Sequence, residues 1–243
     1  MRELIACWQH TRMIVLIGLC AALYAAVFFM FSWIPIIPGL TQFRPAASLP
    51  IVFSVFFGPV AAWGSAFGNI LGDILSGTIG PGSLFGLAGN FVYGYAPYRI
   101  LRAYAKPEET PIGPLLFAIL LASVLCAEII SLGVQALGLA PFSFLANVIL
   151  LNNVVMSLIL APLLIRGLQG RIRRMKSGYL QTLEAQEVSR PLFGKAGAAI
   201  LSVLALAVYV IMMSPALGRS FVSGAALQMA LSILLTALSL ILL

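Results

Sequence analysis

Long apolar runs separated by short polar stretches fill the whole chain, and their spacing sets the expected architecture. The pattern predicts eight membrane-spanning helices, at residues 13–37, 46–57, 59–78, 84–103, 112–137, 142–165, 194–214 and 220–243. A full crossing of a bilayer needs about 20 apolar residues, so segment 46–57 has to be shortened or tilted against its neighbours. Such runs are typical of helical spans and not of the alternating strands of a β-barrel.

Composition agrees with this pattern, because 61% of the 243 residues are hydrophobic and only 9% are charged. Soluble domains carry about 25% charged residues. We therefore expect an all-α integral membrane protein in three parts. Residues 1–168 form a six-helix transmembrane bundle, residues 169–193 form a cytoplasmic linker, and residues 194–243 form two additional transmembrane helices.

The basic residues predict the orientation of the chain. With eight spans and a cytoplasmic N-terminus, twelve of the fourteen Lys and Arg residues lie inside, and only Arg44 and Arg219 lie outside. An alternative joins 46–66 into one span and makes 67–80 a re-entrant loop. It places the stretches "RILRAYAK" and "RGLQGRIRRMK" outside, which the positive-inside rule rejects. The net charge of +7 therefore marks a cytoplasmic face and does not indicate nucleic-acid binding.

Polar side chains gather in the outer halves of the predicted spans. Asp73 lies one helical turn after Asn69 inside an otherwise apolar helix, and an ionisable residue at bilayer depth suggests a functional site. The residues predicted to bind substrate in an outward-open pocket are Arg44, Asn69, Asp73, Asn90, Glu128 and Asn147. The alternative is that amides and hydroxyls only join helices by hydrogen bonds, as in a membrane scaffold.

The motifs of common catalytic and energy-converting sites are missing from the sequence. It has no phosphate-binding G-x-x-x-x-G-K-[ST] loop, no H-E-x-x-H and no G-x-S-x-G, and His10 is the single histidine. We therefore expect no enzyme, no metal centre and no cofactor. Two ways of driving transport stay open. A binding subunit takes its energy from partner proteins, whereas an ion-coupled secondary transporter moves protons through Asp73 and Glu128.

Two stretches resemble the substrate-binding S component of energy-coupling factor (ECF) transporters, the vitamin importers of prokaryotes. They are "IGLCAALYAAVFF" in the first span and "TQFRPAASLPIVFSVFFGPVAAWGSAFGNILGDILSGTIGPGSLFGLAGNF" after it. The similarity covers residues 10–168. The two helices in 194–243 depart from the family, whose unit ends after six spans.

The resemblance implies a substrate-specific subunit of an ATP-driven importer in the cell membrane of a prokaryote. Its partners are a transmembrane coupling subunit, ATPase subunits, the lipid bilayer and a small-molecule micronutrient, with no nucleic acid. The spacing of Ala21/Ala25 and Ala22/Ala26 matches the family's surface for docking on the coupling subunit. Cobalamin-type and queuosine-type compounds are the candidate substrates, and the stretch "QFR" resembles members proposed to carry queuosine precursors.

Overall fold

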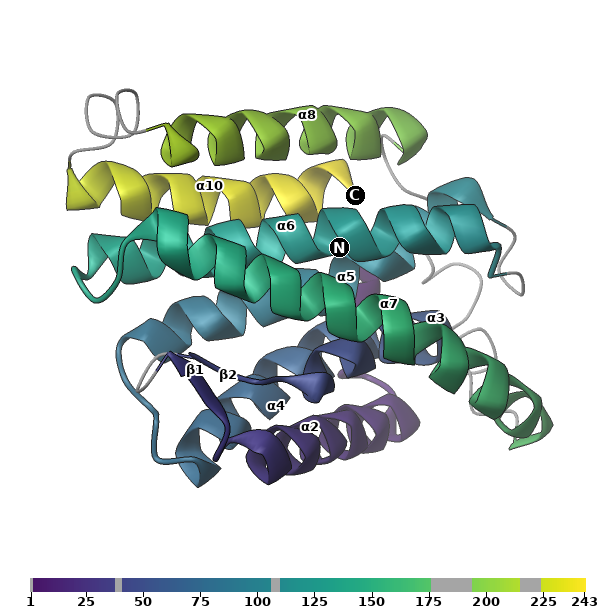
Figure 1. The fold of residues 1–243 in the computed structure, drawn as a ribbon. Coiled ribbons are helices and arrows are strands. Elements are labelled where there is room, and N and C mark those ends of the chain that lie inside the picture. The colour runs from purple at the N-terminus through teal and green to yellow at the C-terminus, as the bar shows by residue number, and fades with distance from the viewer. Residues whose placement is uncertain (1, 38–40, 106–109, 176–193, 215–223) are drawn as a thin grey trace.

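The computed structural model describes residues 2–37, 41–105, 110–175, 194–214 and 224–243, which form a bundle of helices (Figure 1). The helices are α1 (Arg2–Ala6), α2 (Thr11–Phe31), α3 (Ser48–Phe57), α4 (Val60–Leu75), α5 (Gly82–Tyr104), α6 (Ile112–Ala136), α7 (Phe142–Met175), α8 (Gly194–Met213) and α10 (Ala225–Leu242). A 3-10 turn (Pro45–Ala47) precedes α3. Strands β1 (Pro35–Ile37) and β2 (Thr41–Gln42) pair antiparallel. The predicted all-α class is confirmed, with this short hairpin as an addition.

Several element boundaries differ from the predicted spans. Helix α2 ends at Phe31 and not at residue 37, because Pro35 lacks an amide donor and disfavours helical geometry in the residue before it. Gly58, with φ of 57°, ends α3 and is followed by Pro59, which precedes α4. Helix α7 continues to Met175, so residues 169–175 of the expected linker are helical. The rest of the linker, with Lys176 and Arg190, lies outside the described residues, as do Lys106 and Arg219.

Helices α2 and α4 pack closely because α4 presents glycines to its neighbour. A Cβ atom added at Gly68 would lie 2.6 Å from the Cβ of Tyr24, and one added at Gly64 would lie 2.5 Å from the Cβ of Cys20. Small residues at a spacing of four allow this approach of two backbones. The glycine repeat of α4 therefore serves packing within the bundle.

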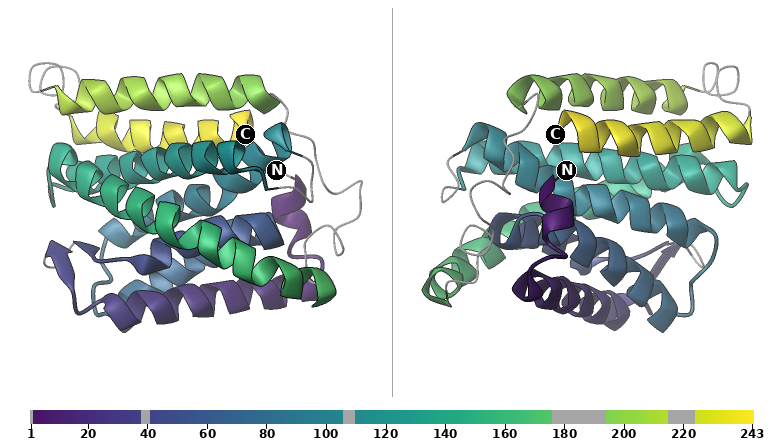
Figure 2. Two further views of the ribbon diagram at one scale, coloured as in Figure 1. Left: turned by 45° about the vertical axis from the view of Figure 1, so that its right-hand side comes forward. Right: turned by 180° about the vertical axis from the view of Figure 1, so that it is seen from behind.

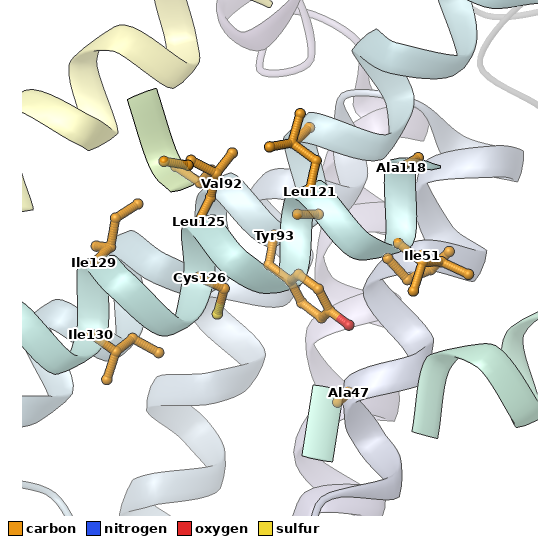
Figure 3. Close-up of a cluster of buried hydrophobic side chains, with 14 of the residues drawn as sticks. Ala47, Ile51, Val92, Tyr93, Ala118, Leu121, Leu125, Cys126, Ile129 and Ile130 are labelled. Carbon is orange, nitrogen blue, oxygen red and sulfur yellow. The ribbon is translucent and has the colours of Figure 1, made fainter. Parts of the chain in front are cut away.

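Helix α6 runs through the centre of the apolar core, and two of its faces meet different neighbours. Figure 3 shows Leu125 and Ile129 on one side of α6 and Cys126 and Ile130 on the other. Tyr93 of α5 is fully buried in the same cluster, and its hydroxyl lies 2.7 Å from the Oγ atom of Ser157 on α7. Residues on both faces of α6 thus belong to one apolar cluster.

The C-terminal helices α8 and α10 pack against this core. Figure 1 and both views of Figure 2 show α10 between α6 and α8. Leu201, Ala205 and Leu235 of the pair belong to the same apolar cluster as α6. The hydroxyl of Ser232 donates to the carbonyl oxygen of Ile129 at 2.9 Å. The pair is therefore joined to the bundle by apolar contacts and by at least one interhelical hydrogen bond.

In the described part of the chain, five helices are long and apolar enough to cross a membrane: α2, α6, α7 from Phe142 to Ile172, α8 and α10. The other predicted spans correspond to α3 with 10 residues, α4 with 16 and α5, which carries Arg99 and Arg102. Most residues of α3, α4 and α5 are buried by neighbouring helices. Because such helices meet protein and not lipid, they tolerate shorter length and polar side chains.

The two ends of the bundle differ in chemistry. Figure 1 places the β1–β2 hairpin at the same end as the α4–α5 and α6–α7 connections, opposite the C-terminal end of α7. At that opposite end, a guanidinium nitrogen of Arg99 lies 2.6 Å from the carboxylate of Glu3, and both side chains are buried. The end with the hairpin holds the cavity described next.

Candidate functional site

A cavity of about 390 Å³ opens at the hairpin end of the bundle. Its polar wall comes from the segment after β2, from α4 and from the start of α5, with the residues Arg44, Asn69, Asp73, Thr78 and Ser83. Its apolar wall comes from α6, α7 and their connection, with the residues Ile130, Val134, Leu139, Leu145 and Ile149. Ligand sites of 300–1,000 Å³ with this division into apolar walls and a few convergent polar groups are common in proteins.

The polar wall contains a continuous chain of hydrogen bonds that we call the polar chain, formed by Arg44, Asn69 and Asp73. The Nη1 atom of Arg44 donates to the Oδ1 atom of Asn69 at 3.3 Å. The Nδ2 atom of Asn69 donates to the Oδ2 atom of Asp73, also at 3.3 Å. Asn69 therefore connects a cation to an anion, and the two bonds determine which way its amide points.

Arg44 and Asp73 form no ion pair within 4.0 Å, although both residues are described. Asp73 is only 6% exposed, and the hydroxyls of Thr78 and Ser83 face its carboxylate. A carboxylate accepts about four hydrogen bonds, so it retains capacity for donors on a ligand. Arg44 and Asp73 are thus connected through Asn69.

Asn90 of α5 donates a hydrogen bond to the middle residue of the polar chain. Its Nδ2 atom donates to the Oδ1 atom of Asn69 at 3.1 Å and to the carbonyl oxygen of Gly86 at 2.8 Å. The hydroxyl of Tyr24 on α2 donates to the Oδ1 atom of Asn90 at 3.1 Å. A Cβ atom at Gly86 would lie 2.7 Å from the Nδ2 atom of Asn69, so this glycine makes room for the amide.

Arg44 is half-buried and is held from several sides. Its guanidinium carbon lies 4.4 Å from the ring centroid of Phe28, and its backbone amide donates to the Oδ1 atom of Asn152 at 3.3 Å. Within the described residues, its buried Nε atom has no hydrogen-bond partner. A desolvated guanidinium stacked on an aromatic ring gains cation–π stabilisation, and its remaining donors are available to a ligand in the cavity.

A small polar recess lies beside the cavity, lined by Tyr24, Arg44, Asn90, Asn152 and Asn153 among others. Its volume is about 10 Å³, which is close to the minimum that holds one water molecule. The recess belongs to the same hydrogen-bonded region as the polar chain.

Glu128, a predicted substrate-binding residue, does not line the cavity. Successive residues of an α-helix turn by about 100°, so Glu128 faces away from Ile130, which does line it. Glu128 is fully buried, and neither carboxylate oxygen has a hydrogen-bond partner among the described residues. It lies near enough to Tyr209 of α8 to interact with it electrostatically. The structure thus places Glu128 on the side of the C-terminal helices, which the sequence did not indicate.

Asn147, the other predicted residue that does not line the cavity, is exposed on α7. Its Oδ1 atom accepts a hydrogen bond from the hydroxyl of Tyr209 at 2.6 Å, and its Nδ2 atom lies 3.5 Å from the sulfur of Met213. Four of the six predicted substrate-binding residues therefore come together, namely Arg44, Asn69, Asp73 and Asn90. Glu128 and Asn147 face α8 because the C-terminal pair packs on α6 and α7.

Comparison with known families identifies the chain. A family model described as QueT transporter matches residues 14–170, which is more than half of the chain. The chain belongs to the QueT transporter family. No curated protein and no solved structure matches it. QueT transporters are S components of ECF transporters, so the resemblance drawn from the sequence is confirmed, and the chain is a multi-pass membrane protein. The match ends before α8, so the C-terminal pair lies outside the QueT region.

The predicted docking alanines divide between the inside and the surface of the QueT region. Ala21 and Ala25 are 4% and 3% exposed, and Ala21 packs against Gly64 and Gly68 of α4. They are therefore closed to a partner, because helical periodicity turns them towards α4. Ala22 and Ala26, which lie about 100° further around α2, are exposed.

Several residues around the QueT cavity were not predicted as site residues. They are Tyr24, Phe28, Thr78, Ser83 and Asn152. The sequence could have indicated Asn152, because it is an amide among apolar residues near the middle of a predicted span. Tyr24 and Phe28 carry no comparable signal, since aromatic residues in a membrane helix are usual at lipid and core positions alike.

Proposed function

We propose that this chain is the substrate-binding S component of an ATP-driven importer and that its substrate is a queuosine precursor, a 7-deazaguanine base. QueT transporters act on queuosine precursors. The observation that carries the proposal for this chain is the polar chain of Arg44, Asn69 and Asp73 along one wall of a 390 Å³ cavity. A 7-deazaguanine is a flat, neutral base with several donors and acceptors on one edge.

The walls of the cavity suit such a ligand in two respects. The apolar side chains of α6 and α7 offer surface to the faces of a planar ring. The opposite wall offers a carboxylate, an amide and a guanidinium, which fix the orientation of a ligand by hydrogen bonds. A cobalamin-type compound, the other candidate from the sequence, is far larger than a cavity of 390 Å³ and has less support.

Transport in this proposal follows the ECF arrangement, with the N-terminus in the cytoplasm of a prokaryotic cell. Substrate enters the cavity from the outside, and a coupling subunit with ATPase subunits supplies the energy. The exposed residues Ala22 and Ala26 offer a smooth face on α2 where another helix can approach closely. The subunit then tips over in the bilayer while it is docked, and releases its substrate inside.

Substrate binding is tested with the full chain purified in detergent. We expect 7-deazaguanine and 7-cyano-7-deazaguanine to raise the melting temperature. At 1,000 times its dissociation constant, a ligand adds about 4 kcal/mol to the free energy of unfolding. Folate and riboflavin serve as unrelated micronutrients that should give no shift. If the two 7-deazaguanines give no shift while another micronutrient does, the proposed substrate is wrong.

The energy source is tested by uptake of a labelled 7-deazaguanine in cells that express the chain with its coupling module. We expect uptake to stop when the ATPase subunits carry a Walker-motif Lys substitution and to continue when an uncoupler is added at constant ATP. The opposite result would favour the ion-coupled alternative. That alternative has less structural support, because Asp73 borders the cavity whereas Glu128 does not.

A further inference from the structure

We infer that the polar chain recognises the edge of the base that carries the 2-amino group, the N1–H group and the O6 oxygen. Asp73 accepts hydrogen bonds from the 2-amino and N1–H groups, and Arg44 donates a hydrogen bond to O6. This inference rests on the proposed function and adds the orientation of the base and the residues that determine specificity.

The order of groups along the polar chain is the first argument. Asp73 is an acceptor at one end, Asn69 lies in the middle, and Arg44 is a donor at the other end. The edge of a guanine-type base presents donor, donor and acceptor in sequence. A carboxylate that faces the two donors and a guanidinium that faces O6 satisfy all three groups at once.

The chemistry of a 7-deazaguanine is the second argument. Arginine commonly reads guanine through O6 and N7 together. A 7-deazaguanine has carbon in place of N7, so this arrangement loses one of its two hydrogen bonds. The edge with O6, N1 and the 2-amino group then remains the richest in hydrogen-bonding groups, and it is the one that a carboxylate beside a guanidinium complements.

The state of the two charged residues in the structure is the third argument. Arg44 lines the cavity, and its guanidinium has further donors besides the Nη1 atom that is bonded to Asn69. Asp73 is held among Asn69, Thr78 and Ser83 but retains acceptor capacity. Leaving buried polar groups unsatisfied is unfavourable, so a ligand that pairs with both is bound more tightly. With this edge on the polar chain, the substituent at C7 lies on the same side of the base as O6 and outside the three groups that are recognised.

Binding measurements on the wild-type chain test this orientation without any substitution. We expect 7-deazaguanine and 7-cyano-7-deazaguanine to bind with dissociation constants within about tenfold of each other. We expect 7-deazahypoxanthine, which lacks the 2-amino group, and 1-methyl-7-deazaguanine to bind about 10- to 100-fold more weakly, as for the loss of one hydrogen bond to a charged group. Equal binding of 7-deazahypoxanthine and 7-deazaguanine would overturn the inference.

The variant Asp73→Asn tests whether Asp73 is the residue that recognises the 2-amino and N1–H groups. We expect it to weaken binding of 7-deazaguanine by about 10- to 100-fold and to reduce the preference over 7-deazahypoxanthine to less than about threefold. Glu128→Gln makes the same chemical change outside the cavity and should leave the preference intact. A preference that persists in a folded Asp73→Asn protein would overturn the assignment. If none of the bases binds the wild type, the proposed function itself fails, which is a different result from binding without discrimination.

Discussion

Two acidic residues lie in the interior of the same helical bundle, and their surroundings are opposite. Asp73 receives a hydrogen bond from Asn69, has Arg44 at the far end of the polar chain, and borders a cavity. Glu128 is buried on α6 near Tyr209 of α8, and its carboxylate has no hydrogen-bond partner in the described part of the chain. Both have the sequence signature of a functional acid in a membrane. Of the two, Asp73 lines the cavity and Glu128 does not.

The two acids differ in whether their neighbours compensate the burial of the carboxylate. Burying a charge is unfavourable at either position. The sequence shows that an ionisable group lies in an apolar helix, but it does not show whether that group binds a ligand. At Asp73 the cost is offset by an amide and a nearby guanidinium that are fixed in position before a ligand arrives. Such fixed partners reduce the ordering that accompanies binding. At Glu128 the structure shows no comparable arrangement among the described residues.

The largest expected effect comes from removing the cation of the polar chain. Arg44→Ala deletes the hydrogen bond to Asn69 and the contact with Phe28, and it leaves Asp73 buried without a nearby cation. We expect 7-deazaguanine to bind at least about 100-fold more weakly, measured by titration calorimetry. Arg171→Ala, at the exposed far end of α7, is the matched control. An affinity within about threefold of wild type would show that Arg44 does not contribute to binding of the base.

A smaller effect is expected from adding one methyl group behind the polar chain. In Gly86→Ala the new Cβ atom would lie 2.7 Å from the Nδ2 atom of Asn69, so the amide that bonds Asp73 has to shift. We expect binding to weaken by about tenfold and unfolding to become easier by about 1–3 kcal/mol. Gly113→Ala is the control, because a Cβ atom there would meet nothing within 4 Å. Unchanged affinity in Gly86→Ala would show that Asn69 can move without harm.

The contrast between the two acids is sharpened by Glu128→Gln. The substitution keeps the shape of the side chain and removes an ionisable group that has no partner among the described residues. We expect an unchanged affinity for 7-deazaguanine and a free energy of unfolding that is equal or higher by up to about 2 kcal/mol. The measurement is thermal unfolding in detergent with and without the base. A loss of binding as large as that of Asp73→Asn would abolish the distinction between the two regions.

The smallest effect is expected where α7 meets α8. The hydroxyl of Tyr209 donates to Asn147 at 2.6 Å on the exposed side of α7. Tyr209→Phe and Asn147→Ala should each lower the free energy of unfolding by about 1 kcal/mol, and the double variant should lose less than the sum. Binding of 7-deazaguanine should not change. Impaired binding in Asn147→Ala alone would return this residue to the substrate site.

Much of the polar wall of the cavity could be predicted from the sequence. Arg44, Asn69, Asp73 and Asn90 stand out because polar residues in apolar helices must find partners away from lipid. Their clustering follows from helical periodicity and from the direction in which each span runs. Glu128 satisfied the same criteria and yet faces elsewhere. The pattern of one helix gives the angle between two side chains, but it does not say which neighbouring helix each side chain meets.

Composition and the length of the apolar runs were enough to predict an all-α membrane bundle, because both depend on the solvent and not on contacts between helices. The sequence also determined the family, through residues that lie in the first two thirds of the chain. The packing of the helices was needed to show that Asn69 separates Arg44 from Asp73, that Ala21 and Ala25 are inside while Ala22 and Ala26 are outside, and that Glu128 lies near Tyr209 of α8. These facts depend on which helices pack together, and packing is set by side-chain shapes that are far apart in the sequence.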